Sequence, residues 1–241
     1  MTRLSGLMLL LMVLLSAAVV LRASEPPKTP DGALILFNGN DLHGWDGDPK
    51  YWSVQDGAIT GQTTKDNPTK GSTFLVWRGG VLKDFELRVK FRIDGGNSGI
   101  QYRGSENGKW TVHGYQADLD AENAYTGICY DEGGDRQIMA AIGEKVLWKP
   151  DKQKQVVGSV GDAKEIKAGI KKGEWNDYVI ICRGDCLIQA INGKVTVEIK
   201  DEDDKRRTME GLLAFQLHSG DPMTVQFKDI TLRVLEGDKG K

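Results

Sequence analysis

The sequence predicts an all-β protein, built as a sandwich of two sheets, and three features of the chain after residue 30 support this class. Short segments alternate apolar and polar residues, most clearly over residues 85–93, which is typical of strands with one buried face. Glycine-containing turns separate these segments, and the 30 glycines of the chain suit many tight turns. Only residues 162–171 have helical character. Many short strands joined by turns indicate a sandwich or a barrel.

The expected strands follow one another at short intervals. They cover residues 33–37, 52–54, 58–60, 85–93, 98–103, 115–120, 127–130, 136–141, 178–182, 187–191, 195–199, 212–218 and 225–234. Asp56-Gly57 and Asn192-Gly193 are strong turn signals because both residue types tolerate a positive φ. Without an internal repeat or a second hydrophobic pattern, the chain is expected to form one domain over residues 31–236, followed by a polar tail at 237–241.

The N-terminal segment has the order of a secretory signal peptide. Arg3 precedes an almost wholly apolar run from Leu7 to Leu15, and small residues follow up to Ala23. We therefore expect residues 1–23 to be a signal peptide, residues 24–30 to be a linker, and the protein to be secreted or periplasmic. An uncleaved membrane anchor is the alternative, since the apolar run continues to Leu21.

Charge and cysteine content exclude some function classes. The net charge is −2 and basic residues form no stripe, so nucleic acid is not an expected partner. Cys182 and Cys186 bracket a short turn between two apolar runs, and we predict that they form a disulfide; the alternative is two half-buried small side chains. Cys129 is assigned to packing. The three cysteines lack the spacing of a zinc site.

A candidate groove follows from the alternation on three strands, residues 98–103, 115–120 and 212–218. Apolar residues at every second position are expected to enter the core. The alternate positions are polar and point outward: Gln101, Arg103, Gln116, Asp118, Asp120, Gln216 and His218. These side chains converge in one groove if the three strands are neighbours in one sheet.

The simpler interpretation is that this polar face is only solvated, as on many antiparallel sheets. Asp118 and Asp120 are alternate residues on one face, however, and two close carboxylates repel each other unless a nearby positive group compensates their charge. Arg103 or a divalent metal ion could be that group; no cofactor is certain. His113 is expected to be a packed or loop histidine, the acidic run 201–204 a solvated loop, and Glu132 and Arg136 part of a loop that could cover the groove.

Seven ordered motifs resemble those of the 3-keto-disaccharide hydrolase family. They are LFNGNDLHGW at 36–45, WSVQDGAITG at 52–61, DFELR at 84–88, NSGIQYR at 97–103, GYQADLD at 114–120, GEWNDY at 173–178 and FKDI at 227–230. The resemblance extends from about residue 31 to 236. It implies a concanavalin A-like jelly roll of the lectin and glucanase type, and cleavage of sugars already oxidised at C3.

This resemblance implies a definite chemistry. A carbonyl at C3 acidifies the proton on C2, so a general base can start a β-elimination that expels the C1 substituent, after which water can add. His218 or Asp118 is the expected base, and Arg103 the expected partner of the enolate oxygen. Gln101, Gln116, Asp120 and Gln216 are expected to bind substrate. A separate oxidoreductase would supply the 3-keto sugar.

The chain departs from the commoner family pattern at one strand. Many members have Glu-x-Gln-x-x-Asp after the Gly-Tyr pair, whereas residues 116–120 read Gln-Ala-Asp-Leu-Asp. The resemblance therefore transfers no catalytic role to Gln116. A carbohydrate-binding, lectin-like module without catalysis is the competing hypothesis, because an amide cannot act as acid or nucleophile. Neither hypothesis fixes the oligomeric state.

Overall fold

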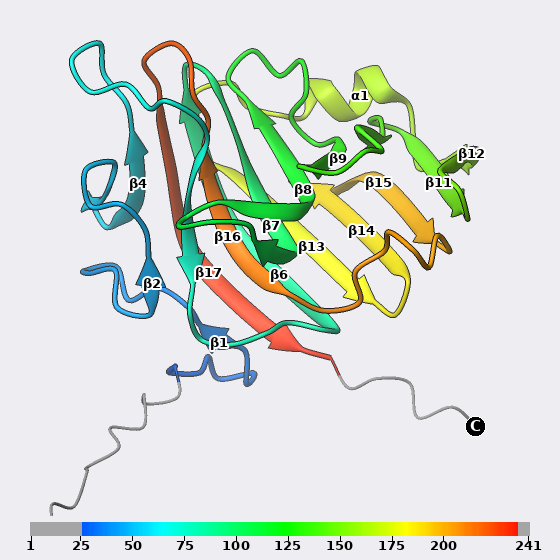
Figure 1. Cartoon of the computed structure of the whole chain (residues 1–241), viewed down its shortest axis with the longest axis horizontal. Helices are drawn as coiled ribbons and strands as arrows, with labels where there is room; N and C mark the ends of the chain where they lie inside the picture. The colour runs from blue at the N-terminus through cyan, green and yellow to red at the C-terminus, as the bar shows by residue number, and fades with distance from the viewer. Residues whose placement is uncertain (1–25, 236–241) are drawn as a thin grey trace, which may run out of the picture.

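The computed structural model describes residues 26–235, which form two packed antiparallel-rich sheets (Figure 1). The larger sheet has the order β12 (Gln153–Ser159), β11 (Glu144–Lys149), β15 (Lys194–Asp201), β14 (Cys186–Ile191), β13 (Asn176–Arg183), β6 (Phe85–Asp94), β17 (Thr224–Val234), β4 (Ala58–Gln62) and β3 (Trp52–Gln55), with β1 (Leu34–Ile35) beside β17. The smaller sheet has the order β10 (Ile138–Ala140), β9 (Cys129–Glu132), β8 (Val112–Asp120), β7 (Asn97–Glu106), β16 (Leu212–Leu217), β5 (Thr73–Trp77) and β2 (Trp45–Asp46). The predicted all-β sandwich is confirmed.

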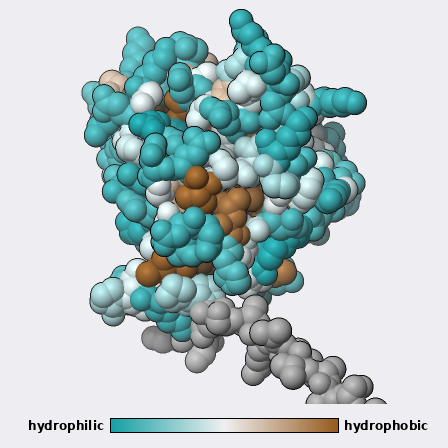
Figure 2. Space-filling view, turned by 90° about the vertical axis from the view of Figure 1, so that its left-hand side faces the viewer, coloured by the Kyte–Doolittle hydropathy of each residue, from teal (hydrophilic) through white to brown (hydrophobic). Residues whose placement is uncertain are grey.

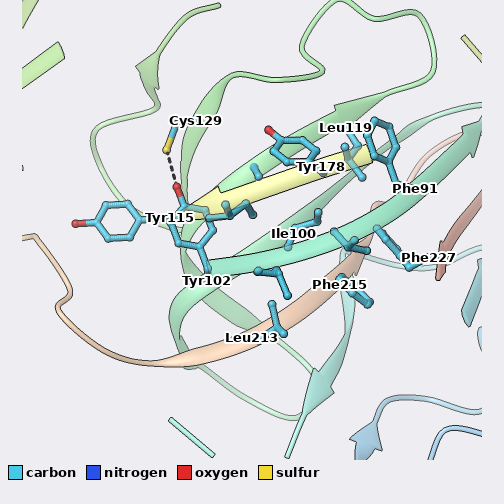
Figure 3. Packing of buried hydrophobic residues seen from close by; sticks show 14 of the residues in the cluster. Phe91, Ile100, Tyr102, Tyr115, Leu119, Cys129, Tyr178, Leu213, Phe215 and Phe227 are labelled. Atoms are coloured by element: carbon cyan, nitrogen blue, oxygen red, sulfur yellow. Dashed lines mark hydrogen bonds between the residues drawn. The ribbon is translucent and has the colours of Figure 1, made fainter. Parts of the chain in front are cut away.

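The core lies between the two sheets. Phe215 of β16 stacks on Phe227 of β17 with ring centroids 3.9 Å apart, which joins one sheet directly to the other. Figure 3 shows this packing, together with Tyr102, whose hydroxyl lies 3.4 Å from the sulfur of Cys129. Cys129 is fully buried, as its assignment to packing required. Because alternate residues of each strand enter this core, the other face of each sheet is left free for polar groups.

The structure adds strands that the alternation did not predict. Strand β5 is buried along almost its whole length, so its sequence shows no alternation of apolar and polar residues. Strand β12 is exposed along its whole length, so it also lacks the alternation that marks a strand with one buried face. The expected helix is shorter than its predicted range: α1 (Ala163–Ala168) is capped by the Asp162 side chain, which accepts from two backbone N–H groups, and it ends at Gly169.

The strand order satisfies the condition for the predicted groove. Strands β8, β7 and β16 are consecutive neighbours in the smaller sheet (Figure 1). Gln101 pairs with Gln116 across β7 and β8, and Gly99 lies between Gln216 and Asp118. The outward positions of three segments far apart in the sequence therefore share one face.

Figure 2 looks onto the side of β2 and β4 and shows an apolar patch surrounded by hydrophilic surface.

Within residues 26–235, no helix is long and apolar enough to cross a membrane. The expected signal peptide, the polar tail and the first residues of the linker lie outside the described residues, so export remains a prediction.

The hairpin of β13 and β14 corrects the proposed disulfide. All three cysteines are free. Cys182 pairs with Leu187, and Arg183 pairs with Cys186. Cys186 is therefore not opposite Cys182 but next in sequence to the residue that is. Successive strand residues face opposite sides of a sheet, which places the Cys182 thiol in the core and the Cys186 thiol on the surface.

Thiol labelling should separate the three cysteines. In native protein we expect a maleimide to modify Cys186 alone, because Cys129 and Cys182 are buried and burial raises the pKa of both thiols. After denaturation all three should react. Intact-mass spectrometry measures this, and a native protein that takes no label and weighs two mass units less would contradict it.

Candidate active site

A pocket of about 490 Å³ opens on the outward face of the smaller sheet. It is lined by Asn97, Gln116, Asp118, Asp120, Tyr125, Ile128, Tyr130, Glu132, Gln137, Ile138 and His218. Four of the predicted site residues therefore border one cavity: Gln116, Asp118, Asp120 and His218. Its size lies within the range of small-molecule sites.

Asp118 has the most unusual environment in this pocket. Its Oδ1 atom accepts hydrogen bonds from the Asn97 side chain at 3.0 Å, from the Gln116 side chain at 3.2 Å and from the Leu119 backbone N–H at 3.0 Å. Its Oδ2 accepts none from residues 26–235. Burial raises the pKa of Asp118 to about 7, and the nearby Asp120 charge adds to this, although the three donors oppose it. A carboxylate held at one oxygen and titrating near neutrality suits a general base.

A chain of amides holds Asp118 in place. The Gln101 amide nitrogen donates to Oε1 of Gln116 at 2.5 Å, and the Gln116 amide nitrogen donates to Asp118. Gln116 occupies the space above Gly99, where an added Cβ would lie 2.3 Å from the Gln116 side-chain carbonyl carbon. Gln116 is thus a positioning residue, and Gln101, which is fully buried, acts behind it rather than on a ligand.

His218 lies just after β16 and borders the pocket. Its Nδ1 atom is 2.5 Å from the backbone carbonyl of Ser219. A carbonyl oxygen can only accept a hydrogen bond, so Nδ1 carries the hydrogen. Nε2 is then the nitrogen that can exchange a proton with a ligand. Among the residues that line the pocket, His218 is the one side chain that can become a cation.

Glu132 is a candidate that the alternation did not place. It lies at the end of β9, half-buried, and borders the pocket. Burial raises the pKa of its carboxyl group, while His218, His113 and the Gln216 amide oppose the shift. The Gln216 side chain is fully buried and completes no hydrogen bond within the described part of the chain, so it approaches Glu132 without binding it. Gln216 is not among the residues that line the pocket. His113 is half-buried near Glu132, and its ring packs against Gly133, which agrees with the packed or loop histidine expected.

Asp120 has a mainly local task. Its Oδ1 atom accepts from the backbone N–H groups of Glu122 and Ala124, which closes the loop after β8. This loop carries Tyr125 and Ile128 to the pocket. Asp120 therefore shapes the wall and adds negative charge near Asp118.

The placement of Arg103 in the groove is wrong. Its side chain is 1% exposed, pairs with Asp84 at 3.0 Å, and donates to the backbone carbonyls of Lys83 and Gly184. The register of β7 against β8 shifts between Tyr102 and Ser105, and Arg103 has a φ of 49°. Such a bulge breaks the alternation of faces, so Arg103 turns inward although Gln101 points outward.

A second buried network corrects the acidic run. Asp201 and Asp203 are buried, not solvated. Asp201 accepts from the Arg136 guanidinium at 2.7 Å and from the Tyr115 hydroxyl at 2.6 Å. Arg136 also pairs with Asp131, so this arginine anchors the segment after β9 instead of covering the pocket. Within residues 26–235, no group of three or more His, Cys, Asp or Glu side chains is arranged to hold a metal ion.

Together, the fold and the pocket define a β-sandwich protein with an acidic groove on one sheet. Residues 32–233 match the family described as the 3-keto-alpha-glucoside-1,2-lyase-like domain, and the chain belongs to this carbohydrate-active family. The resemblance seen in the motifs is confirmed. No curated protein matches the chain.

Solved structures share the sandwich. A protein of Parabacteroides distasonis named as a glycosyl hydrolase is 23% identical, with a TM-score of 0.57, over 86% of this chain and 95% of that one. The carbohydrate-binding module CBM66 of Bacillus subtilis is 14% identical, with a TM-score of 0.51, over 79% and 95% of the two chains. A Bacillus subtilis protein of unknown function with a galectin-like fold is 11% identical, with a TM-score of 0.51, over 80% and 90%. At these identities the likeness concerns the fold.

Proposed function

We propose that the protein cleaves the glycosidic bond of 3-keto-glycosides by β-elimination, with Asp118 as the base. The observation that supports this most is the Asp118 carboxylate, whose Oδ1 is held by three donors while its Oδ2 has no partner in the described residues. Its pKa of about 7 leaves a large basic fraction at neutral pH. Membership of the family supports the sugar class.

The first step is removal of the C2 proton. Asp118 Oδ2 takes the proton, the electron pair of the C2–H bond forms a C2=C3 bond, and the C3 carbonyl oxygen becomes an enolate oxygen. His218, as imidazolium, donates from Nε2 to this oxygen, which is the task that Arg103 cannot perform from its buried position.

The second step expels the leaving group. The enolate pair returns to form the C3 carbonyl, a C1=C2 bond forms, and the C1–O bond breaks with its electrons on the leaving oxygen. Glu132 supplies the proton that this oxygen needs, because burial raises the pKa of its carboxyl group and so favours the protonated acid. Addition of water across C1=C2 then completes a net hydrolysis.

The reaction needs a substrate already oxidised at C3, so we propose that a separate sugar oxidoreductase acts before this protein. We also propose that it works outside the cytoplasm, in the periplasm or medium. The charged, apolar and small-residue order of residues 1–23 supports this location.

An assay on a chemically prepared 3-keto-glucoside tests the function. We expect the wild type to release the aglycone and to form a product that absorbs as an enone before it is hydrated. A protein that binds the non-oxidised glycoside but leaves every 3-keto-glycoside intact would instead be a lectin-like binding module. Repeating the assay with a chelator reveals any dependence on a metal ion.

His218→Gln should lower kcat by about 10²–10³-fold, because one hydrogen-bond donor to a developing oxyanion is worth roughly that factor. The melting temperature should stay within a few degrees, since the ring is exposed. His43→Gln is the matched control, because His43 is exposed and lies outside the pocket. Full activity in His218→Gln would remove His218 from the mechanism.

A further inference from the structure

One wall of the pocket differs in chemistry from the side that carries Asp118 and His218. Tyr125 is 50% exposed and Ile138 is 39% exposed, and both border the pocket. Ile128 and the ring of Tyr130 complete this wall. Large apolar side chains that stay exposed beside a polar site commonly mark a place where a ligand is bound.

The apolar wall is continuous with the proposed catalytic residues. Ile138 pairs with Tyr130 across β10 and β9, and Tyr130 pairs with Gln116 across β9 and β8. One cross-strand row therefore leads from the edge of the sheet to the amide that holds Asp118. Cross-strand neighbours on one face have Cβ atoms about 5 Å apart, so a ligand held at Asp118 extends directly onto Tyr130 and Ile138.

The chemistry of this wall selects among possible occupants. A second sugar would need several hydrogen-bond partners for its hydroxyl groups. Ile128 and Ile138 supply none, and the Tyr130 hydroxyl already donates to the Gln137 side chain at 2.8 Å. A flat apolar ring needs only contact area, which two tyrosine rings and two isoleucines offer.

We propose that this wall, formed by Tyr125, Ile128, Tyr130 and Ile138, binds the leaving group, and that the preferred substrates are glycosides with an aromatic aglycone. The inference rests on the proposed function for the position of the sugar, since the oxidised ring must lie over Asp118 and His218. The bond from C1 to the aglycone oxygen then points toward β9 and β10.

The test compares three aglycones on the same 3-keto-glucosyl group: 4-nitrophenyl, methyl and a second glucose. We expect kcat/KM for the 4-nitrophenyl substrate to exceed the other two by about tenfold or more, since small changes in apolar contact shift discrimination by that much. In a Tyr125→Ser/Ile138→Ser double variant, this preference should shrink to about twofold, because the 4-nitrophenyl substrate loses more kcat/KM than the methyl substrate does. Val156→Ser/Val157→Ser is the matched control, because these valines are exposed on β12, outside the pocket.

A binding measurement separates this inference from the proposed reaction. Titration with the non-oxidised 4-nitrophenyl and methyl glucosides should show about tenfold tighter binding of the aryl compound, lost in the double variant. If no 3-keto-glycoside is cleaved but this difference in Kd holds, the proposed function fails and the aromatic subsite stands. Equal kcat/KM and equal Kd for the aryl and methyl compounds would overturn the subsite, as would preference for the second glucose.

Discussion

Asp118→Asn is expected to lower kcat on 3-keto-glucosides by about 10²–10⁴-fold, because a positioned general base typically contributes that much. The amide is nearly isosteric, and its oxygen can still accept from Asn97, Gln116 and the Leu119 N–H. What the variant loses is a basic Oδ2, so the loss should appear in kcat and in kcat/KM together. Initial rates with the aryl substrate measure this.

The pH dependence gives a second signature of the same residue. In the wild type, kcat/KM should rise as pH increases through about 7, where Asp118 loses its proton, and should fall again at higher pH as the proton that Glu132 gives to the leaving group is lost. The residual activity of Asp118→Asn should lack this rise. A rising limb with a midpoint near 4 would show that a different, unshifted carboxylate is the base.

Stability should change in the opposite direction. The folded-state pKa of Asp118, about 7, lies above the ordinary aspartate value of 3.8, so its proton favours the folded state at low pH. This contribution is complete below about pH 4 and is lost as pH rises through 7, where a buried charge must form. Asp118→Asn avoids that charge, so its unfolding free energy should exceed that of wild type by about 2–4 kcal/mol at pH 8 and by little at pH 4. Urea unfolding at both pH values measures it; an equal difference at both would contradict the buried-carboxylate assignment.

Arg103→Met is expected to destabilise the fold by about 3–5 kcal/mol. The change leaves the carboxylate of Asp84 without its buried partner, and it frees the carbonyl groups of Lys83 and Gly184. Arg88→Met is the matched control, because the pair of Arg88 with Glu86 is largely exposed on the arginine side and should contribute less than about 1 kcal/mol.

The same variant tests the corrected role of Arg103. If the folded fraction of Arg103→Met keeps its specific activity at a low temperature, the residue is structural, as its contacts indicate. Wild-type stability combined with a hundredfold loss of kcat would return Arg103 to the reacting atoms. Thermal melts and rates on the same preparation distinguish the two results.

Strand alternation was enough to predict much of the site from the sequence. Gln116 and Asp118 on β8 and His218 after β16 all border the pocket. In a regular strand with one buried face, the alternate residues must point to the opposite face. The same reasoning missed Glu132, whose turn-rich surroundings have no clear period. It also missed the apolar wall, since nothing in the sequence distinguishes Tyr125 or Ile138 from core residues.

The amino-acid sequence by itself determined the sandwich, the family and the outward phase of the regular strands, because local patterns of apolar residues carry that information. The tertiary structure decided where those patterns break. The bulge after Tyr102 turns Arg103 toward Asp84, and the one-residue offset in the β13–β14 hairpin separates Cys182 from Cys186. The pKa of Asp118 likewise follows from burial under neighbouring strands. Register, burial and charge pairing depend on partners distant in the chain, which is the physical reason that only the folded molecule reveals them.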